Sequence, residues 1–335
     1  MIAQCSDWGN LWVVTWLVTG GAGYIGSHVV RKLRQSSLSV VVFDDFSTGV
    51  RSFVPPDVPL IEGTLLDTAL IENALREHNV EGVIHIAGFK FAGISVEKPL
   101  YAYEQNVTAM MSLLGAMSRV GVGNIVFSSS SSVYGNAASG LVKEEHPFNP
   151  TSPYGESKVI GEWLLRNQGV ATGLRHTSLR YFNVVGSAET DLPDVSPYNL
   201  FSMVFAGLEE GNVPTVFGTD YDTPDGTCIR DYIHVGDLAA AHVGAAQRLA
   251  AGESVEPAYN LGSGTGTSVA QMMTSISEVT QQPFTPGRGP RRAGDPARVV
   301  ASGDLAARDL GWAMTYSLED MISSAWEARK SLSPA

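Results

Sequence analysis

Apolar and polar positions alternate with two different periods along the first half of the chain, and these periods predict strands and helices. Five short apolar segments rich in valine and isoleucine have the length of buried strands: residues 12–19, 39–43, 81–86, 124–128 and 177–181. Four longer segments between them have helical spacing: residues 25–35, 67–78, 100–118 and 154–167. Such an alternation predicts an α/β fold of the Rossmann type, with a doubly wound parallel sheet.

The pattern loosens after about residue 183, where turn-rich segments separate the apolar ones. Helices are expected in four segments of this half: 199–210, 236–249, 268–279 and 317–329. They predict a smaller mixed α/β lobe that covers the first domain and binds the substrate. We expect the first domain over residues 1–183, with segments around 229–262 returning to it, and the lobe over residues 184–228 and 263–335.

The composition and net charge of the chain restrict the kinds of partner that it can bind. The chain of 335 residues has 22 Lys+Arg and 34 Asp+Glu, a formal net charge of −12, and 44% of its residues are hydrophobic. The apolar content is enough for a large core, whereas the acidic balance repels nucleic acid and anionic lipid. The apolar segment Leu11–Val18 is too short to cross a bilayer. We therefore expect neither a nucleic acid nor a membrane as partner.

Cysteine and histidine usage gives no sign of a disulfide framework or a metal site. Cys5 and Cys228 are the two cysteines, which fits a reducing cytoplasm. His234 and His242 lack the spacing of a zinc motif and are interpreted as structural residues. We expect no metal.

A glycine-rich turn follows the first predicted strand and opens the first predicted helix. Gly20, Gly23 and Gly26 give the spacing of a dinucleotide fingerprint, in which the backbone approaches a pyrophosphate at a helix N-terminus. A glycine-rich hairpin is the alternative. Asp44 ends the next strand 18 residues beyond Gly26, where a carboxylate binds the ribose hydroxyls and repels a 2′-phosphate. The pair predicts NAD as cofactor rather than NADP.

Candidate reacting groups lie further along the chain. Tyr154 and Lys158 are four residues apart on a predicted helix and therefore share one face. A lysine ammonium and a cationic nicotinamide ring both lower the pKa of a neighbouring tyrosine, which makes it usable as a base. The serine run 128–132 ends the fourth predicted strand, where open parallel sheets bind ligands. Chance pairing and an ordinary serine loop are the alternatives, but the order of the three features favours a catalytic site.

With these motifs the chain resembles the extended short-chain dehydrogenase/reductase family, and within it the UDP-hexose 4-epimerases that act on UDP-glucose and UDP-galactose. The resemblance runs from about Trp16 to about Trp326. Its most specific segments are TGGAGYIGSH (19–28), HIAGFK (85–90), SVEKPL (95–100), FSSSSSVYG (127–135), SPYGESK (152–158), LRYFNVVG (179–186), FGTDYDTPDGTCIRDYIHV (217–235), YNLGSGTG (259–266) and PRRAGD (290–295).

The resemblance implies a role for each matching residue. Tyr154 would be the base on the sugar 4-hydroxyl, Lys158 would tune it and hold the nicotinamide ribose, and Ser130 would bind the 4-oxygen. Besides the three glycines, Tyr154 and Lys158, the NAD site would comprise Tyr24, Ile25, Asp44, Asp45, Ser47, Lys90, Asn106, Tyr181 and Phe182. Besides Ser130 and Tyr154, the UDP-sugar site would comprise Asn183, Asn199, Leu200, Val216, Phe217, Arg230, Arg292, Asp295 and Val299.

The arginine assignments also have independent support, because a protein with net charge −12 needs local guanidinium groups to bind a pyrophosphate. A solvated basic patch is the alternative for Arg230 and Arg292, and a simple turn residue is the alternative for Asn183. The resemblance also implies a tightly bound NAD that is regenerated in each turnover, through a transient 4-keto sugar. It suggests a homodimer formed through the helices near 100–118 and 154–167.

Three positions depart from the family pattern. Thr64 follows Gly63 where the family usually has an acid near the adenine, and Asp45 replaces a common Asn. Val299 lies where the family's pocket wall faces the sugar, and valine leaves room for UDP-N-acetylglucosamine and UDP-N-acetylgalactosamine. Two alternatives stay open: a nucleotide-sugar 4,6-dehydratase or decarboxylase, which would need an acid where Ser131 and Ser132 stand, and a non-catalytic NAD-sensing protein, which would not need the tyrosine, lysine and serine together.

Overall fold

The computed structural model describes five stretches of the chain: residues 14–36, 38–136, 140–197, 199–291 and 295–332. The start of the first predicted strand, residues 12–13, and the predicted site residue Arg292 lie outside them.

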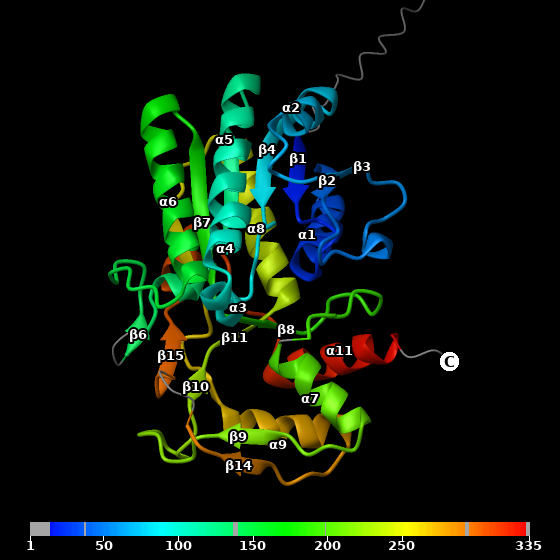
Figure 1. Ribbon diagram of the computed structural model, residues 1–335, viewed down its shortest axis with the longest axis vertical. Helices are drawn as coiled ribbons and strands as arrows, with labels where there is room; N and C mark the ends of the chain where they lie inside the picture. Colours follow the sequence, from blue (N-terminus) through cyan, green and yellow to red (C-terminus); the bar gives the residue numbers. More distant parts are fainter. Residues whose placement is uncertain (1–13, 37, 137–139, 198, 292–294, 333–335) are drawn as a thin grey trace, which may run out of the picture.

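A seven-stranded sheet forms the centre of the larger part of the molecule (Figure 1). Its strands are β1 (Thr15–Thr19), β2 (Ser39–Asp44), β3 (Leu60–Glu62), β4 (Val80–His85), β5 (Asn124–Ser128), β7 (Arg175–Tyr181) and β12 (Ala258–Leu261). Their order is β12-β7-β5-β4-β1-β2-β3, and every neighbouring pair is parallel. The order reverses between β1 and β4, which is the switch point where such sheets bind ligands. The predicted doubly wound sheet is confirmed.

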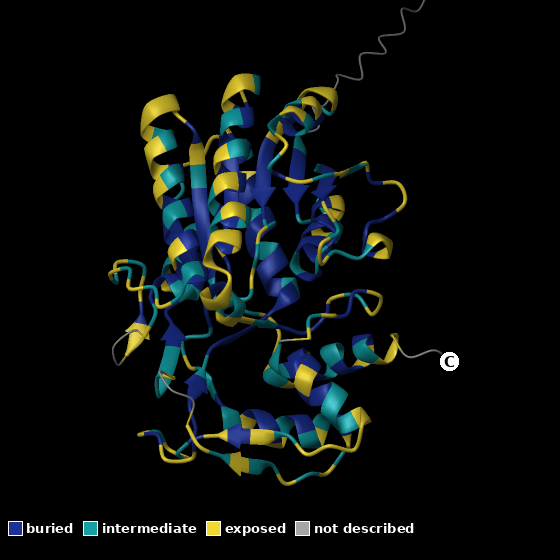
Figure 2. Cartoon of the chain, in the orientation of Figure 1, coloured by how far each residue is buried: buried dark blue, intermediate teal, exposed yellow. Residues whose placement is uncertain are grey.

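Alternation along the strands builds a core on each face of this sheet. In β1, Trp16 and Val18 pack toward α1 (Tyr24–Gln35), α8 (Val235–Ala250) and α10 (Asp304–Leu310). Leu17, between them, packs toward the opposite face, which is covered by α2 (Thr68–Glu77), α5 (Ala109–Val120) and α6 (Pro153–Thr172). Because successive residues of a strand point to opposite faces, one apolar run fills both cores. Figure 2 shows these strands as largely buried.

Helix α6 begins and ends on clear local signals. The Ser152 side chain accepts a hydrogen bond from the Gly155 N–H, and Pro153 occupies the first turn. The helix runs five residues beyond the predicted end at 167 because it tolerates Gly169 and stops at Gly173, which adopts φ 77°. The helix predicted over 100–118 consists of α4 (Pro99–Tyr103), a π-helical turn at Glu104–Thr108 and α5.

The smaller part of the molecule lies below the carboxyl ends of the parallel strands in Figure 1. Its core is built by α7 (Leu200–Glu209), α9 (Val269–Thr280) and α11 (Leu318–Lys330), next to the pair β9 (Thr215–Phe217) and β14 (Gly287–Gly289). A four-stranded mixed sheet joins β13 (Thr267–Ser268), β10 (Ile229–Arg230), β15 (Arg298–Ala301) and β6 (Leu141–Val142). A further parallel pair consists of β8 (Asn183–Val185) and β11 (Tyr232–His234). The predicted smaller mixed lobe is confirmed.

Across the part of the chain that the structure describes, no helix combines the length and the apolar character needed to cross a membrane.

Candidate active site

A cavity of about 340 Å³ opens at the carboxyl ends of β1, β2 and β4 and reaches to α6. Twelve of the fourteen predicted cofactor residues line it: Gly20, Gly23, Tyr24, Ile25, Gly26, Asp44, Asp45, Ser47, Lys90, Tyr154, Lys158 and Tyr181. The lining also contains aromatic residues that the sequence analysis did not single out: Phe43, Phe89, Phe91 and Tyr101. The cavity therefore joins the glycine-rich turn to the tyrosine and lysine of α6.

The glycine-rich turn leaves room for an anion at the start of α1. Gly20 adopts φ 72°, and its N–H donates to the Phe43 carbonyl at 2.8 Å. A Cβ on Gly26 would overlap the Gly20 carbonyl oxygen, so the helix can approach the turn only with glycine there. Gly23 caps α1 without a side chain. The first N–H groups of α1 thus face the cavity as a positive helix end, which is a cradle that fits a pyrophosphate.

Asp44 lies at the end of β2 and braces the same turn. Its Oδ2 accepts from the Ala22 N–H and its Oδ1 accepts from the Phe46 N–H, both at 2.9 Å. Burial raises the pKa of Asp44, and these two hydrogen bonds oppose that shift. A carboxylate at this edge of the cavity suits ribose hydroxyls and repels an added phosphate.

Helix α6 brings the predicted reacting groups together. Tyr154 and Lys158 lie one turn apart, with the Lys158 Nζ 5.7 Å from the centre of the Tyr154 ring. The same Nζ donates to the Ser128 carbonyl at 2.9 Å. Ser130 begins a 3₁₀ turn at Ser131–Val133, accepts from the Ser132 N–H at 3.1 Å, and shares a hydrogen bond with the Tyr154 hydroxyl. The strand-end serine and the helix therefore meet at one point.

Burial opposes charge on both Tyr154 and Lys158. It raises the pKa of Tyr154, although the hydrogen bond with Ser130 lowers it. It lowers the pKa of Lys158 to about 8, although the charge of Glu162 raises it. A tyrosinate here consequently needs a positive charge close by, which the Lys158 ammonium supplies.

His85 is a buried residue at the end of β4, and it has no predicted role. Its Nδ1 shares a hydrogen bond with Thr19 Oγ1 at 2.8 Å, and its ring stacks on Phe127 at 5.6 Å. Burial and the Lys158 charge lower the pKa of His85 to about 3, so it is neutral at ordinary pH. It therefore adds no second positive charge beside Lys158.

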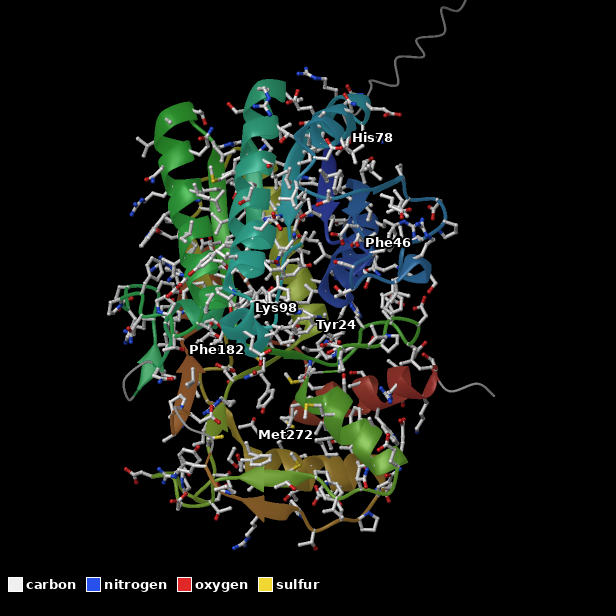
Figure 3. The ribbon with its side chains drawn as sticks, viewed as in Figure 1. Tyr24, Phe46, His78, Lys98, Phe182 and Met272 are labelled. Carbon is white, nitrogen blue, oxygen red and sulfur yellow. The ribbon has the colours of Figure 1, made fainter. Side chains whose placement is uncertain are left out.

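Two predicted cofactor residues do not line the cavity. Asn106 projects from the π-helical turn, where its Nδ2 donates to the Phe89 carbonyl at 3.0 Å and to Ser157 Oγ at 2.8 Å. Its Oδ1 accepts from the Phe89 N–H at 2.6 Å. Asn106 thus fixes the loop that carries Phe89 and Lys90. Phe182 is buried beside Val133 and Tyr134, at the level where the two parts of the molecule meet (Figure 3).

The predicted substrate residues fall into separate groups. Asn183 begins β8, and its N–H and Nδ2 both donate to the Asp231 carbonyl, at 3.1 and 2.8 Å. Asn199 caps α7 by accepting from the Phe201 N–H, and its Nδ2 donates to Asp194 at 2.7 Å. Both side chains are therefore already held by the protein.

A second group gathers where β10 pairs with β15. This register places Arg230 opposite Val299, and an Arg230 Nη2 lies 3.4 Å from Asp295 Oδ1. Val299 packs against the cluster that contains Phe182. By contrast, Val216 is buried in the core of the smaller part, and Leu200 packs against that core.

Phe217 is 38% exposed. Tyr221, in the segment that follows Phe217, has no predicted role. The Tyr221 hydroxyl is buried and has no hydrogen-bond partner among the residues that the structure describes. Its ring lies under the Arg291 guanidinium, 4.2 Å from the ring centre, and that arginine also pairs with Asp220 at 2.6 Å. A buried phenol amid acidic loop residues has no sequence signature.

The histidines considered above have structural contacts. The His234 ring stacks on Tyr316 at 3.7 Å, and the His242 Nε2 lies 2.7 Å from Ser128 Oγ. Among the described residues, no group of three histidine, cysteine or acidic side chains could hold a metal ion.

The cavity of this Rossmann-type sheet has a dinucleotide cradle at one end and a tyrosine and a lysine at the other, and a serine is hydrogen-bonded to that tyrosine. Together these features define a nucleotide-dependent oxidoreductase site of the short-chain dehydrogenase/reductase class. The chain belongs to the NAD-dependent epimerase/dehydratase family, whose model matches residues 16–262. This match confirms the resemblance that the sequence motifs carry.

Comparisons with known proteins agree with this family. The chain is 42% identical over 321 residues to the UDP-glucose 4-epimerase of Azospirillum brasilense, covering 94% of this chain and 92% of that one. The structure of UDP-glucose 4-epimerase from Brucella ovis in complex with NAD is 39% identical, with a TM-score of 0.90 over 94% of this chain and 98% of that one. The UDP-Glc/GlcNAc 4-epimerase of Campylobacter jejuni is 32% identical, with a TM-score of 0.84 over 95% of this chain and 99% of that one.

Proposed function

We propose that this protein is an NAD-dependent epimerase that inverts C4 of UDP-glucose and UDP-galactose. The observation that carries the proposal is that Tyr154 and Lys158 line the cavity that begins at the glycine-rich turn, while Ser130 shares a hydrogen bond with the Tyr154 hydroxyl. The relatives named UDP-glucose 4-epimerase, at about 40% identity over nearly the whole chain, support it.

NAD fits the cradle and the Asp44 carboxylate, and when bound it supplies the acceptor for hydride from C4 and the donor that returns it. Tyr154 takes the proton of the sugar 4-hydroxyl and later gives it back. Lys158 stabilises the tyrosinate, and Ser130 holds the 4-oxygen through its hydroxyl. Inversion at C4 would require the oxidised sugar to turn its opposite face toward the bound NAD while Tyr154 and Ser130 hold the 4-oxygen.

Rotation of the keto sugar requires that the UDP moiety remain anchored. We assign this anchor to Arg230, Asp295 and Asn183, together with Arg292 outside the described residues. Arg230 already pairs with Asp295, so a diphosphate would find a positioned guanidinium. The proposed division follows: residues 1–183 with segments around 229–262 bind NAD, and residues 184–228 and 263–335 bind the UDP-sugar.

The test is interconversion of UDP-galactose and UDP-glucose by the purified protein, with products resolved by chromatography and bound nucleotide identified after denaturation. The expected result is one equilibrium mixture from either sugar and NAD, not NADP, in the denatured supernatant. A dehydratase would instead give a 4-keto-6-deoxy product. That reaction needs an acidic residue at positions 131 and 132, where this chain has Ser131 and Ser132. A protein that carries NAD but is inert toward every UDP-hexose would contradict the proposal.

Val299 leads to a prediction about the accepted sugar. Because its side chain is small and lies next to the Phe182 cluster, we expect UDP-N-acetylgalactosamine to be epimerised as well. The relative from Campylobacter jejuni, named a UDP-Glc/GlcNAc 4-epimerase, supports this proposal. Substitution Val299→Tyr should reduce kcat/KM for the N-acetylated sugar by at least about tenfold and leave UDP-galactose less affected. Absence of turnover of the N-acetylated sugar by the unsubstituted protein would contradict it.

Exposed apolar residues on α4, α5 and α6 support a homodimer. Leu100 is 82% exposed, Met111 57%, Trp163 44% and Val170 87%, and α6 packs beside α4 and α5. Isolated apolar residues are common at surfaces, but several on adjacent helices indicate an interface. Sedimentation should give twice the chain mass of 35.7 kDa, and Leu100→Glu with Met111→Glu should give the single mass. A monomeric unsubstituted protein would contradict the dimer.

We also propose a cytoplasmic location, which suits a chain with two cysteines and a nucleotide-sugar substrate.

A further inference from the structure

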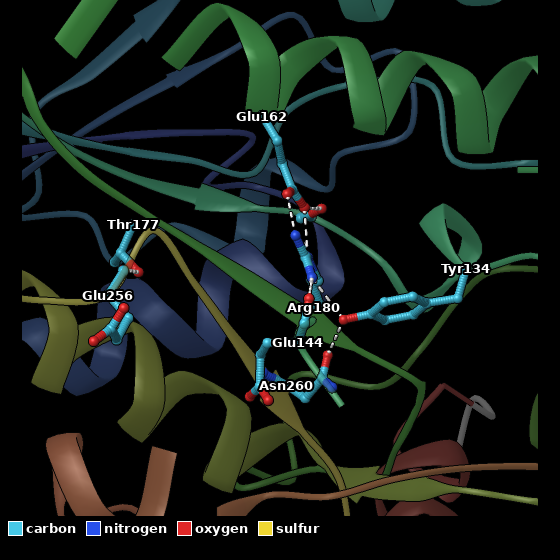
Figure 4. A network of polar contacts seen from close by, with 8 residues as sticks. Tyr134, Glu144, Glu162, Thr177, Arg180, Glu256 and Asn260 are labelled. Atoms are coloured by element: carbon cyan, nitrogen blue, oxygen red, sulfur yellow. Dashed lines mark hydrogen bonds and ion pairs between the residues drawn. The ribbon is translucent and has the colours of Figure 1, made fainter. Parts of the chain in front are cut away.

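A buried network of polar contacts joins the catalytic helix α6 to β7 (Figure 4). Arg180 on β7 donates from Nε to Glu162 Oε1 at 2.9 Å and from Nη2 to Glu162 Oε2 at 2.6 Å. Ser129 donates from Oγ to Glu162 Oε1 at 2.6 Å. All three residues are at least nine-tenths buried, and none lines the cavity. The proposed reaction therefore does not use this ion pair directly.

The other end of the network reaches the far side of the serine turn. Arg180 donates from Nη1 to the Tyr134 hydroxyl at 2.6 Å, and that hydroxyl donates to Asn260 Oδ1 at 2.8 Å. Figure 4 shows Arg180 between Glu162 and Tyr134. Ser130 lies between Ser129 and Tyr134 in the chain, so the network holds the turn that carries Ser130 on both sides.

Stability alone does not account for such a pair. The cost of removing two charges from water often equals or exceeds their attraction, and an apolar replacement of the whole pair is often neutral or stabilising. The position of the Glu162 and Arg180 pair, against the serine turn and on the catalytic helix, points instead to the reaction.

Glu162 and Lys158 are neighbours on the buried face of α6, one turn apart. Their contacts go to consecutive residues at the end of β5: Lys158 to the Ser128 carbonyl and Glu162 to the Ser129 hydroxyl. Glu162 is the buried carboxylate next to the Lys158 ammonium, and Arg180 binds it on the side of β7.

Two histidines and one tyrosine around Lys158 are neutral in the working range of pH. Burial lowers the pKa of His85 on β4 to about 3 and that of His242 on α8 to about 4. Burial raises the pKa of Tyr181 on β7. Besides the tyrosinate form of Tyr154, the proposed base, Glu162 is the negative charge that acts on Lys158, and Arg180 binds Glu162 from β7.

We propose that Glu162 is a positioning residue of this site: through Ser129 it fixes the turn that carries Ser130, and through its negative charge it keeps Lys158 protonated. The proposal rests on the proposed function. Arg180 holds Glu162 in place by binding both of its oxygens.

The sign of the pH effect follows from the charges. Burial lowers the pKa of Lys158 to about 8, and Glu162 raises it against that trend. Activity requires the Lys158 ammonium. Activity is therefore present below this pKa and is lost as the pH rises through this pKa. Removal of the Glu162 charge should therefore move the alkaline limb of the kcat profile to lower pH, by about one unit.

The isosteric variant Glu162→Gln tests the charge, and Glu162→Asp is its matched control because it keeps the charge and shortens the arm. The glutamine variant should show the lowered alkaline limb, whereas the aspartate variant should lose kcat with the limb unmoved. Glu209→Gln removes a carboxylate from an ion pair with Arg329, far along the chain in the smaller part, and should leave the profile unchanged. A merely structural role would lower kcat in both Glu162 variants without any shift.

Titration of the holoprotein by NMR supplies a readout besides activity. The chain has six lysines, so 13C labelling at the lysine ε carbon gives few signals, and Lys158→Met assigns the one of interest. That signal should titrate near pH 8 in the unsubstituted protein and about one unit lower in Glu162→Gln. If the single variant does not fold, Glu162→Gln with Arg180→Gln removes the guanidinium that would otherwise lose its carboxylate, and the Lys158 signal should shift in the same direction.

Ser129→Ala tests the second part of the proposal, in which the hydrogen bond from Ser129 to Glu162 fixes the turn that carries Ser130. Loss of the hydroxyl loosens the turn and should lower kcat roughly tenfold, with KM and the alkaline limb nearly unchanged. Unchanged kcat in Ser129→Ala, or an unmoved Lys158 titration in Glu162→Gln, would overturn the corresponding arm. An inactive holoprotein whose Lys158 titration still moves would contradict the proposed function and leave this inference standing.

Discussion

Replacement of Tyr154 by phenylalanine is expected to lower kcat for interconversion of UDP-galactose and UDP-glucose by about 10³-fold. The substitution removes the hydroxyl that bonds Ser130 on the ring beside Lys158, and general base catalysis typically contributes 10²- to 10⁴-fold. The aromatic ring remains, so the wall of the cavity is preserved. We therefore expect KM and the amount of bound NAD to stay within about twofold of the unsubstituted protein.

The size of this effect separates chemistry from folding. Tyr154 loses a hydrogen bond with Ser130, which contributes about 1 kcal/mol to the free energy of unfolding. A loss of that size does not unfold a domain with ordinary stability of 5–15 kcal/mol. Thermal unfolding should consequently show a small change while kcat collapses.

Tyr316→Phe is the matched control for this experiment. Its ring stacks on His234 outside the cavity, and the phenylalanine ring keeps that stack. The control should retain full activity. Full activity in Tyr154→Phe itself would show that another group accepts the 4-hydroxyl proton.

Much of the larger part of the fold could be predicted from local sequence, because its strands are apolar runs and its helices carry end signals. Ser152 and Pro153 mark the start of α6, and β5 covers the predicted residues 124–128. The strands β3 and β12 were not predicted, since three and four residues show too little periodicity to be recognised. Their place in the sheet depends on pairing with β2 and β7.

The site also contains some residues that local sequence predicts and others that it does not. The glycines, Asp44, Tyr154 and Lys158 belong to short motifs whose spacing reflects one local geometry, and they all line the cavity. Asn106 does not, because a π-helical turn redirects its side chain to the Phe89 backbone, and no local pattern predicts that turn. The contact between Glu162 and Arg180 joins a helix to a strand 18 residues away, so its partners become evident only in the folded chain.

Gly26→Ala is the second substitution with a large expected effect. A Cβ there would overlap the carbonyl oxygen of Gly20 and lie 2.8 Å from Gly21 Cα, and both are backbone atoms that cannot move independently. Helix α1 must therefore shift away from the turn, which we expect to cost about 1–3 kcal/mol of the free energy of unfolding. The shift also moves the first N–H groups of α1 away from the pyrophosphate, so NAD should bind roughly 100-fold more weakly.

Gly244→Ala is the matched control, because it makes the same chemical change inside a helix of the same domain. A Cβ at Gly244 meets no atom within 4 Å, and alanine in a helix interior is favoured over glycine by about 0.5–1 kcal/mol. The two variants should therefore move the unfolding midpoint in opposite directions, and calorimetry of the NAD-depleted proteins checks this. Isothermal titration with NAD then measures the cofactor. A Gly26→Ala protein that binds NAD as tightly as the Gly244→Ala protein would show that the close approach of α1 to the turn does not create the cofactor site.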